Sequence, residues 1–500
     1  MGGEGVGGNF LDVVAKLPYL VKLGINAVQL LPVVEYPTQY SLGYNGVDYF
    51  SPETDYGVPD TAPNFDDYCT TANNLLLDRQ ANAVLFSKQQ LTTTVNQLRV
   101  LIDLCHVYGV AVILDVVYNH AGGDFGDKSL YFLDRQPTGD QNRSLYFTDH
   151  GWAGGLVFAY WNADVRQFLI DNALMWLQEC HADGFRYDEV SVMFNEGGEW
   201  GYTVCQHLTD TCRYVRPDAV HIGEHWPPQK NIVTPTSAGG AGFDACLNDG
   251  LREAVRGAIS QASYGAHIKV NMDAIAAHLS STQLGDRRRA VQMVENHDIV
   301  REGRAQRLAL LADSNNPESW YARSRARVAL GLVVTAPGIP HIFMGQECLE
   351  SAQWSDVTER APAVNWQALN QNNERKAFLQ FSQTLLALRA REPALSSETI
   401  NVFHVHNDNR VLAFHRWLPG VGRDVVVIVS LNEQSFSEYT IGVPFGGTWY
   451  YYLNSDDFEF PATLPMINVQ TQANSIPMHG LNCSLTIQLP ANSIVVLGAH

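Results

Sequence analysis

Short apolar segments alternate with amphipathic stretches of helical periodicity between residues 10 and 350, and this alternation limits the possible folds more than any other feature. Helices that alternate with buried strands are typical of parallel βαβ units. So many units favour a closed barrel, and we therefore predict a (β/α)8 TIM barrel. The candidate strands are residues 25–31, 110–115, 184–188, 220–224, 242–247, 290–295 and 339–344.

The start of the chain does not supply the first strand that such a barrel needs. A Gly-rich segment leads directly into a predicted helix over residues 10–23, which Asn9 can cap and Gly24 can end. Pro18 is expected to kink or shorten this helix. Either the first strand lies outside this sequence, or another segment closes the gap.

Two further patterns divide the chain. Residues 51–91 and 121–161 interrupt the alternation and are predicted to be inserted loops over the same end of the barrel. After Pro393, short strands follow one another at turn-like spacing, without a helical pattern between them. We therefore predict a catalytic barrel over residues 1–395 and a C-terminal antiparallel β-sandwich over residues 396–500. The strands expected in this second domain are residues 411–417, 424–431, 448–453, 483–489 and 493–497.

The composition excludes several classes of partner and location. Acidic residues outnumber basic ones by 52 to 33, which argues against nucleic acid or an anionic membrane as the main partner. The eight cysteines include no Cys-x-x-Cys pair and are expected to be buried hydrophobes. No apolar run is long enough to span a membrane, and the first eight residues do not form a signal peptide. These features together predict a cytoplasmic protein.

Polar groups stand at the ends of four of the predicted strands. The carboxyl ends of parallel strands meet on one face of a barrel, so these groups should converge although Asp188 and Glu224 are 36 residues apart. The four strand ends are residues 115–120 (Asp-Val-Val-Tyr-Asn-His), 184–189 (Gly-Phe-Arg-Tyr-Asp-Glu), 223–226 (Gly-Glu-His-Trp) and 295–298 (Glu-Asn-His-Asp).

Paired carboxylates at these positions predict glycosyl transfer. A retaining glycosidase needs one ionised carboxylate as nucleophile and one protonated carboxylic acid. Arg186 is two residues before Asp188 on one strand, so both side chains point the same way and the guanidinium holds Asp188 ionised. Trp226 is close to Glu224, and an apolar neighbour raises a carboxyl pKa, as a general acid requires.

Other residues of the predicted pocket have matching roles. His120 and His297 can donate hydrogen bonds to sugar hydroxyls, and Asp298 can stabilise developing positive charge. A divalent metal site is the competing chemical interpretation, but Arg186 would repel a dication. Each residue alone is also explained as a group that caps a loop. Four such strand ends together favour a catalytic site.

The four blocks resemble the signature blocks of the α-amylase family, glycoside hydrolase family thirteen, in their order and on the expected strands. The turn at residues 43–46 and the segment 340–347 extend this resemblance over nearly the whole chain. The resemblance implies that Asp188 is the nucleophile, Glu224 the acid/base and Asp298 the transition-state stabiliser. It also implies substrate-binding residues beside the bond that is cut, namely Tyr44, Asp115, His120, Arg186 and His297.

The resemblance within the family is divided. Residues 155–162, 344–347 and 489–493 look like glycogen branching enzymes, whereas the block at 295–298, followed by Ile299, looks more like an α-amylase. We predict a 1,4-α-glucan branching enzyme that acts on glycogen, starch or maltooligosaccharides. Hydrolysis of the α-amylase type is the alternative, and a non-catalytic glucan-binding relative is a third. The oligomeric state is left open by the sequence.

No organic cofactor is expected, and calcium is the one candidate metal. Asn119 is similar to a calcium ligand of many α-amylases, with Asp124, Asp127 and Asp164 as partners, but a hydrogen-bonded Asn at a strand end is the simpler interpretation. Tryptophans can also stack on sugar rings, although tryptophan is as often a core residue. The candidates for such stacking are Trp161, Trp200 and Trp226.

Overall fold

The computed structural model describes residues 8–38, 41–122, 130, 134, 144–355, 364–464 and 469–499. The chain forms two compact units. The first consists of Met1–Leu247 with Ser355–Pro362, and the second of Asn248–Trp354 with Ala363–His500. The predicted domain boundary at residue 395 falls inside the second unit and stays a prediction.

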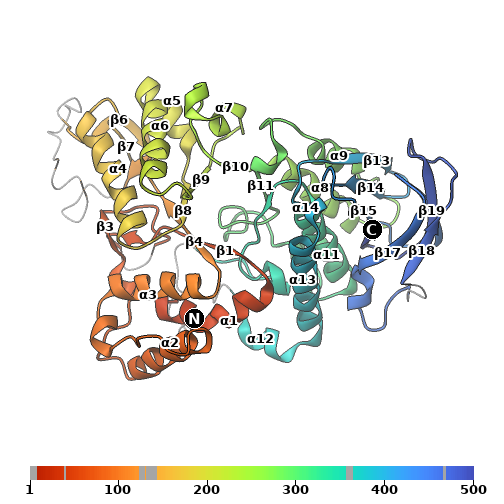
Figure 1. Ribbon diagram of the computed structural model, residues 1–500, viewed down its shortest axis with the longest axis horizontal. Helices are drawn as coiled ribbons and strands as arrows, with labels where there is room; N and C mark the ends of the chain where they lie inside the picture. Colours follow the sequence, from red (N-terminus) through yellow and green to blue (C-terminus); the bar gives the residue numbers. More distant parts are fainter. Residues whose placement is uncertain are drawn as a thin grey trace. The chain divides into compact units, whose positions relative to one another are not determined.

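The first unit is built on a parallel sheet (Figure 1). Its strands run in the order β1-β4-β8-β9-β10 and coincide with predicted strands. In the described part of the chain no strand precedes α1, and β1 forms an edge of the sheet, where it pairs with β4. The strand bounds are β1 Ala27–Leu30, β4 Ala111–Val116, β8 Gly184–Tyr187, β9 Val220–Gly223 and β10 Ala245–Asn248.

Helices connect these parallel strands. The first helix, α1, begins and ends where the sequence predicts, because Asn9 and Asp12 form a capping box and Gly24 ends it at a φ of 93°. The expected shortening at Pro18 is wrong, because the helix continues through this residue with both ends capped. The helices are α1 Phe10–Leu23, α2 Phe65–Arg79, α3 Thr94–Val107, α4 Ala163–Gln178, α5 Val190–Glu196, α6 Gly198–Val215 and α7 Lys230–Val233.

The two predicted loop insertions have structure of their own. Residues 51–91 contain α2, whose first turn carries Asp66 and Asp67, as the dipole of a helix favours. The segment 121–161 is described in part and contributes to a small sheet in the order β5-β7-β6. The short strands that precede these insertions or lie within them are β2 Val34–Glu35, β3 Asp48–Pro52, β5 His120–Ala121, β6 Phe147–Trp152 and β7 Gly155–Phe158.

The second unit contains the last two predicted barrel strands and the C-terminal β-structure. The strands β11 Ala290–Gln292 and β12 Ile339–Pro340 pair in parallel. The helix α11 is buried on nearly all sides and packs against α13. The helices are α8 Gly250–Ser263, α9 Met272–Leu279, α10 Leu308–Ala312, α11 Trp320–Thr335, α12 Trp366–Gln371, α13 Asn373–Arg391 and α14 Pro393–Ser396.

The C-terminal strands pair antiparallel, as predicted, in the orders β13-β14-β15-β20-β17-β18 and β16-β19. Alternate residues of these strands form a core that includes Val426, Trp449 and Leu497. The sequence pattern missed β13, β16 and β18. The bounds are β13 Asn401–His406, β14 Val411–Arg416, β15 Asp424–Ser430, β16 Phe436–Val443, β17 Gly447–Asn454, β18 Gln470–Ala473, β19 Cys483–Leu489 and β20 Ser493–Ala499.

Two predictions about the chain as a whole can be compared with this fold. All eight cysteines lie in described residues and are free, and each is buried, as expected. Among the described helices, none has the length and apolar character that crossing a membrane requires.

Candidate active site

Strand register brings the polar strand ends of the first unit together. Asp115 on β4 lies opposite Arg186 on β8, and Tyr187 lies opposite Gly223 on β9. The residues that follow this last pair, Asp188 and Glu224, are therefore neighbours at the carboxyl ends of two adjacent strands. This is the convergence that parallel strands predict.

A glycine at the start of β8 permits this close pairing. Gly184 has a φ of 157°, and a Cβ atom there would lie 2.1 Å from the carbonyl oxygen of Val220 on β9. No side chain fits at that distance, so only glycine allows β9 to approach β8 at this point.

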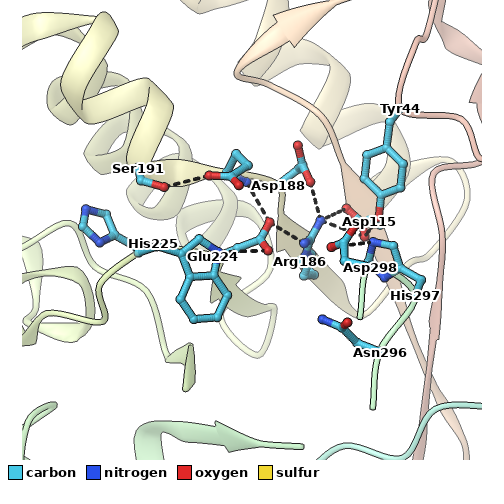
Figure 2. A network of polar contacts seen from close by, with 12 residues as sticks. Tyr44, Asp115, Arg186, Asp188, Ser191, Glu224, His225, Asn296, His297 and Asp298 are labelled. Atoms are coloured by element: carbon cyan, nitrogen blue, oxygen red, sulfur yellow. Dashed lines mark hydrogen bonds and ion pairs between the residues drawn. The ribbon is translucent and has the colours of Figure 1, made fainter. Parts of the chain in front are cut away.

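Arg186 is the centre of the site (Figure 2). Its side chain is 1% exposed, and Nη1 donates to Asp115 Oδ1 at 2.9 Å and to Asp188 Oδ1 at 2.8 Å. Nη2 donates to Glu224 Oε2. The predicted contact between Arg186 and Asp188 is confirmed, but the same guanidinium also binds two further carboxylates.

Asp115 holds the Arg186 guanidinium in place and also binds Tyr44. The hydroxyl of Tyr44 donates to Asp115 Oδ2 at 2.8 Å, and Arg186 Nη1 lies 3.0 Å from the same oxygen. Burial raises the pKa of Asp115 to about 7, although the charge of Arg186 opposes this shift. Because its side chain is fully buried, Asp115 fixes Arg186 and Tyr44 rather than facing the solvent.

Glu224 has the environment of a general acid. Burial raises its pKa to about 8, against the charge of Arg186 and with the help of repulsion from Asp188 and Glu189. A buried cluster of three carboxylates and one guanidinium cannot hold every carboxyl ionised at low cost, so protons remain in it near neutral pH. The direction predicted for Glu224 is confirmed, but its cause needs correction. Trp226 is not simply an apolar neighbour, because its Nε1 donates to Glu224 Oε1 at 3.2 Å.

Asn119 binds the carboxyl oxygen of Asp188 that Arg186 does not. Its Nδ2 donates to both Asp188 O and Asp188 Oδ2 at 2.8 Å, and its Oδ1 contacts Nδ1 of His120. Burial lowers the pKa of His120, while the charge of Asp188 opposes this shift. The sequence indicated Asn119 only as a calcium candidate, and nothing in its spacing indicated the contact with Asp188.

Glu189 is a second residue that sequence reasoning missed. Its φ of 40° is left-handed, a conformation that costs a non-glycine residue about 1–3 kcal/mol. This turn directs the Glu189 backbone N–H at Glu224 Oε2, 3.0 Å away. Its side chain accepts a hydrogen bond from Ser191 Oγ at 2.8 Å, which supports the turn. No residue type in the segment indicates such a backbone.

The remaining predicted site residues, His297 and Asp298, belong to the second unit. His297 Nε2 lies 3.2 Å from Asp298 Oδ2, and the backbone oxygen of His297 accepts a hydrogen bond from Trp354 Nε1 at 2.9 Å. That these two side chains meet Asp188 and Glu224 in one pocket stays a prediction.

A metal site at Asn119 does not fit the described residues. Both polar atoms of its side chain already bind protein groups, and Asp124 and Asp127 lie outside the described residues. Within the described ranges, no group of three or more His, Cys, Asp or Glu side chains could hold a metal ion. Calcium at this position stays a prediction from the sequence.

Two of the three candidate sugar-stacking tryptophans are exposed. Trp161 is 57% exposed and Trp200 39%, and the guanidinium of Arg166 lies 4.6 Å from the centroid of the Trp200 ring. Trp226, by contrast, takes part in the carboxylate cluster. Stacking of Trp161 or Trp200 on sugar stays a prediction.

Comparison with family models identifies both parts of the chain. Residues 129–397 match the alpha amylase catalytic domain, and residues 403–500 match the alpha amylase C-terminal all-beta domain. The chain belongs to the α-amylase family. The resemblance carried by the four blocks is thereby confirmed, and so is the predicted fold class.

Solved structures agree with this fold. The crystal structure of the α-amylase from Geobacillus thermoleovorans in complex with acarbose has a TM-score of 0.68 at 18% identity, and covers 98% of this chain and 92% of that chain. A pullulanase from Anoxybacillus in complex with maltotetraose also has a TM-score of 0.68, at 20% identity. This match covers 96% of the present chain and 65% of the pullulanase chain.

Curated relatives in the family include branching enzymes. The 1,4-alpha-glucan branching enzyme GlgB of Corynebacterium glutamicum is 26% identical over 524 residues, which cover 97% of this chain and 63% of the relative. GlgB of Marinobacter nauticus is 26% identical over 510 residues, with 96% and 72% covered. GlgB of a Synechococcus strain is 24% identical, and this chain spans 59% of its length. The chain thus spans about three fifths of the first and the last of these relatives.

Proposed function

We propose that this chain is a retaining enzyme acting on α-1,4-glucans, with Asp188 as nucleophile and Glu224 as acid/base. The observation that carries the proposal is the shared Arg186: one buried guanidinium binds both carboxyls, while burial gives Glu224 a pKa of about 8. An ionised nucleophile beside a protonated acid is what the first step of retaining glycosyl transfer needs.

In this mechanism Asp188 Oδ attacks the anomeric carbon as the glycosidic C–O bond breaks, and Glu224 gives its proton to the leaving oxygen. A glycosyl–Asp188 ester results. Glu224, now ionised, takes the proton of the acceptor hydroxyl, whose oxygen displaces Asp188 and restores both carboxyl groups. Asp298 stabilises the positive charge that develops on the sugar ring in both steps.

The other predicted site residues have supporting roles in the proposal. Tyr44, His120 and His297 contact the sugar beside the bond that is cut. Arg186 and Asp115 are too deeply buried to contact the sugar over much area, so they act mainly by fixing the carboxylates and Tyr44.

We propose branching as the activity, in which the acceptor is a 6-hydroxyl group of another glucan and the product an α-1,6 branch. Support comes from the relatives named branching enzymes, whose matches cover 96–97% of this chain. The block at residues 295–298 favours α-amylase-type hydrolysis as the second candidate, because it resembles an α-amylase more than a branching enzyme. Glycogen, starch and maltooligosaccharides are the proposed substrates.

The cytoplasm is the proposed location. Eight buried cysteines without a disulfide fit a reducing compartment.

Incubation with amylose separates the candidate functions. Branching should lower the iodine colour with almost no new reducing ends, whereas hydrolysis should lower the colour and release many reducing ends. If neither the iodine colour nor the number of reducing ends changed while the protein still bound amylose, only the non-catalytic relative would remain. Debranching of the product with an α-1,6-specific hydrolase should restore the colour only if branches were made.

A further inference from the structure

The loop that carries Asp298 is fixed at its base by two buried arginines. Residues 295–307 form this loop, which lies in the second unit between β11, which ends at Gln292, and α10, which begins at Leu308. Glu295 is 1% exposed and Arg307 is fully buried, so the two ends of the loop meet inside the protein.

Arg307 joins these ends through an ion pair. Its Nε lies 3.0 Å from Glu295 Oε2, and Glu295 Oε1 accepts the backbone N–H of Leu308 at 2.5 Å. Arg307 Nη2 also donates to Met344 O at 3.1 Å, and its guanidinium lies 5.3 Å from the centroid of the Phe343 ring. The first and last residues of the loop are therefore tied to each other and to the segment after β12.

Arg256 on α8 makes a second bridge across the same base. Its Nη1 donates to Val294 O at 3.1 Å and its Nη2 to Gln306 O at 2.7 Å. Both carbonyls belong to residues directly beside Glu295 and Arg307. Two arginines from different elements thus join the same two backbone segments.

Trp354 fixes the loop a third time, next to Asp298. Its indole Nε1 donates to His297 O at 2.9 Å, and its own carbonyl accepts the backbone N–H of Glu302 at 2.8 Å. A peptide on each side of Asp298 is therefore bound to the same residue.

We propose that Arg307 and Trp354 are positioning residues that act on catalysis through Asp298, by holding the backbone of this loop. The inference rests on the proposed function, because it assigns no chemistry of its own to either residue. A carboxylate that stabilises a transition state must be placed to a fraction of an ångström, and a misplacement of 1 Å costs on the order of 100-fold in rate. A purely structural role would instead lower the stability of the fold and leave the turnover of folded enzyme unchanged.

The test is a double-mutant cycle on the full chain, with kcat and KM measured on amylose and the melting temperature recorded. Asp298→Asn establishes how much Asp298 contributes. Arg307→Met should lower kcat about 10- to 100-fold with little change in KM, and Arg307→Lys should recover part of the loss. In the Asp298→Asn background, Arg307→Met should cost less than about 2-fold, because the residue through which it acts is gone.

Failure of the proposed function and failure of the positioning role would give different results. Wild-type kcat in Asp298→Asn would contradict the proposed function. A strong loss in Asp298→Asn together with wild-type kcat in Arg307→Met, or with fully additive losses in the double variant, would overturn the positioning role.

A milder variant covers the case in which Arg307→Met does not fold. Trp354→Phe removes one hydrogen bond and keeps an aromatic ring in place, and should lower kcat several-fold with KM nearly unchanged. Trp449→Phe is the matched control, because Trp449 is also buried and its Nε1 also donates to a backbone carbonyl, Phe445 O, at 3.3 Å. Equal kcat in the two variants would overturn the proposal.

Discussion

Arginine is used differently in the two units. In the first, Arg186 binds the carboxylates themselves, namely those of Asp115, Asp188 and Glu224. In the second, Arg256 and Arg307 do not bind Asp298 but tie together the ends of the loop that carries it.

The difference matches what each carboxyl group is proposed to do. Asp188 and Glu224 are buried carboxyls, and a cation in direct contact offsets part of the cost of burying them, while burial still raises the pKa of Glu224 to about 8, as a general acid needs. Asp298 only has to be negative and correctly placed, which an exposed carboxylate on a fixed loop provides with His297 rather than an arginine at its side. A direct cation would in fact cancel the charge with which Asp298 stabilises the transition state.

The largest expected effect comes from removing the nucleophile. Asp188→Asn keeps the shape of the side chain and its contact with Asn119, but the amide cannot form the glycosyl ester. Turnover of amylose should fall by a factor of about 1,000 or more. The control is Asp218→Asn, at a side chain that is 80% exposed and precedes β9, at the end of that strand opposite to Glu224. Substantial turnover in Asp188→Asn would contradict the assigned mechanism.

Much of the cluster was predictable because it depends on strand periodicity. The alternation of side chains placed Arg186 and Asp188 on one face of β8, and parallel register placed Glu224 beside them. These contacts follow from regular backbone, so a correct strand assignment is enough to predict them.

The rest depends on loops and was not predictable. The contact of Asn119 with Asp188, the left-handed Glu189 and the hydrogen bond from Trp226 each follow from a turn after a strand. No periodicity determines the conformation of such turns. The strands β16 and β18 were missed for a related reason, since exposed polar residues interrupt the apolar pattern of β16 and make up much of β18.

Substitution of Arg186 should have the next largest effect on turnover. Two variants distinguish the contribution of its charge from that of its geometry. Arg186→Met leaves three buried carboxyls without a cation, and removal of one partner from such a cluster costs about 3–5 kcal/mol of stability. Arg186→Lys keeps the charge but cannot reach three carboxylates with a rigid fork, so kcat should fall about 100-fold with a smaller loss of stability. Urea denaturation and amylose turnover measure the two quantities.

The control for Arg186 is an exposed ion pair. Arg288 binds Asp286 at 2.8 Å with side chains 61% and 26% exposed, and Arg288→Met should cost about 0–1 kcal/mol. A similar cost for Arg186→Met would mean that the buried cluster does not depend on its cation.

Asn119 should have an intermediate effect. Asn119→Ala removes the amide that donates to Asp188, and kcat should fall about 10-fold because the nucleophile is then held from one side only. The matched control is Asn162→Ala, which removes a helix cap at α4 and should cost about 1 kcal/mol of stability without changing kcat. An unchanged kcat in Asn119→Ala would show that Arg186 alone positions Asp188.

The smallest expected effect is a change in pH dependence. Because the pKa of Glu224 is raised to about 8, its acid form persists through neutral pH, and kcat/KM should fall only above about pH 8. The raised pKa also makes the free energy of unfolding depend on pH. The contribution of Glu224 is complete below its ordinary pKa of 4.5 and is lost as the pH rises through 8.

Trp226 Nε1 donates to the carboxylate of Glu224 and favours its ionised form, so Trp226→Phe should raise the pKa of Glu224 further and move the basic limb to higher pH. Trp200→Phe replaces an exposed indole instead and should leave the limb in place. A limb that moved to lower pH in Trp226→Phe would mean that the indole acts on Glu224 by excluding water rather than by donating its hydrogen bond.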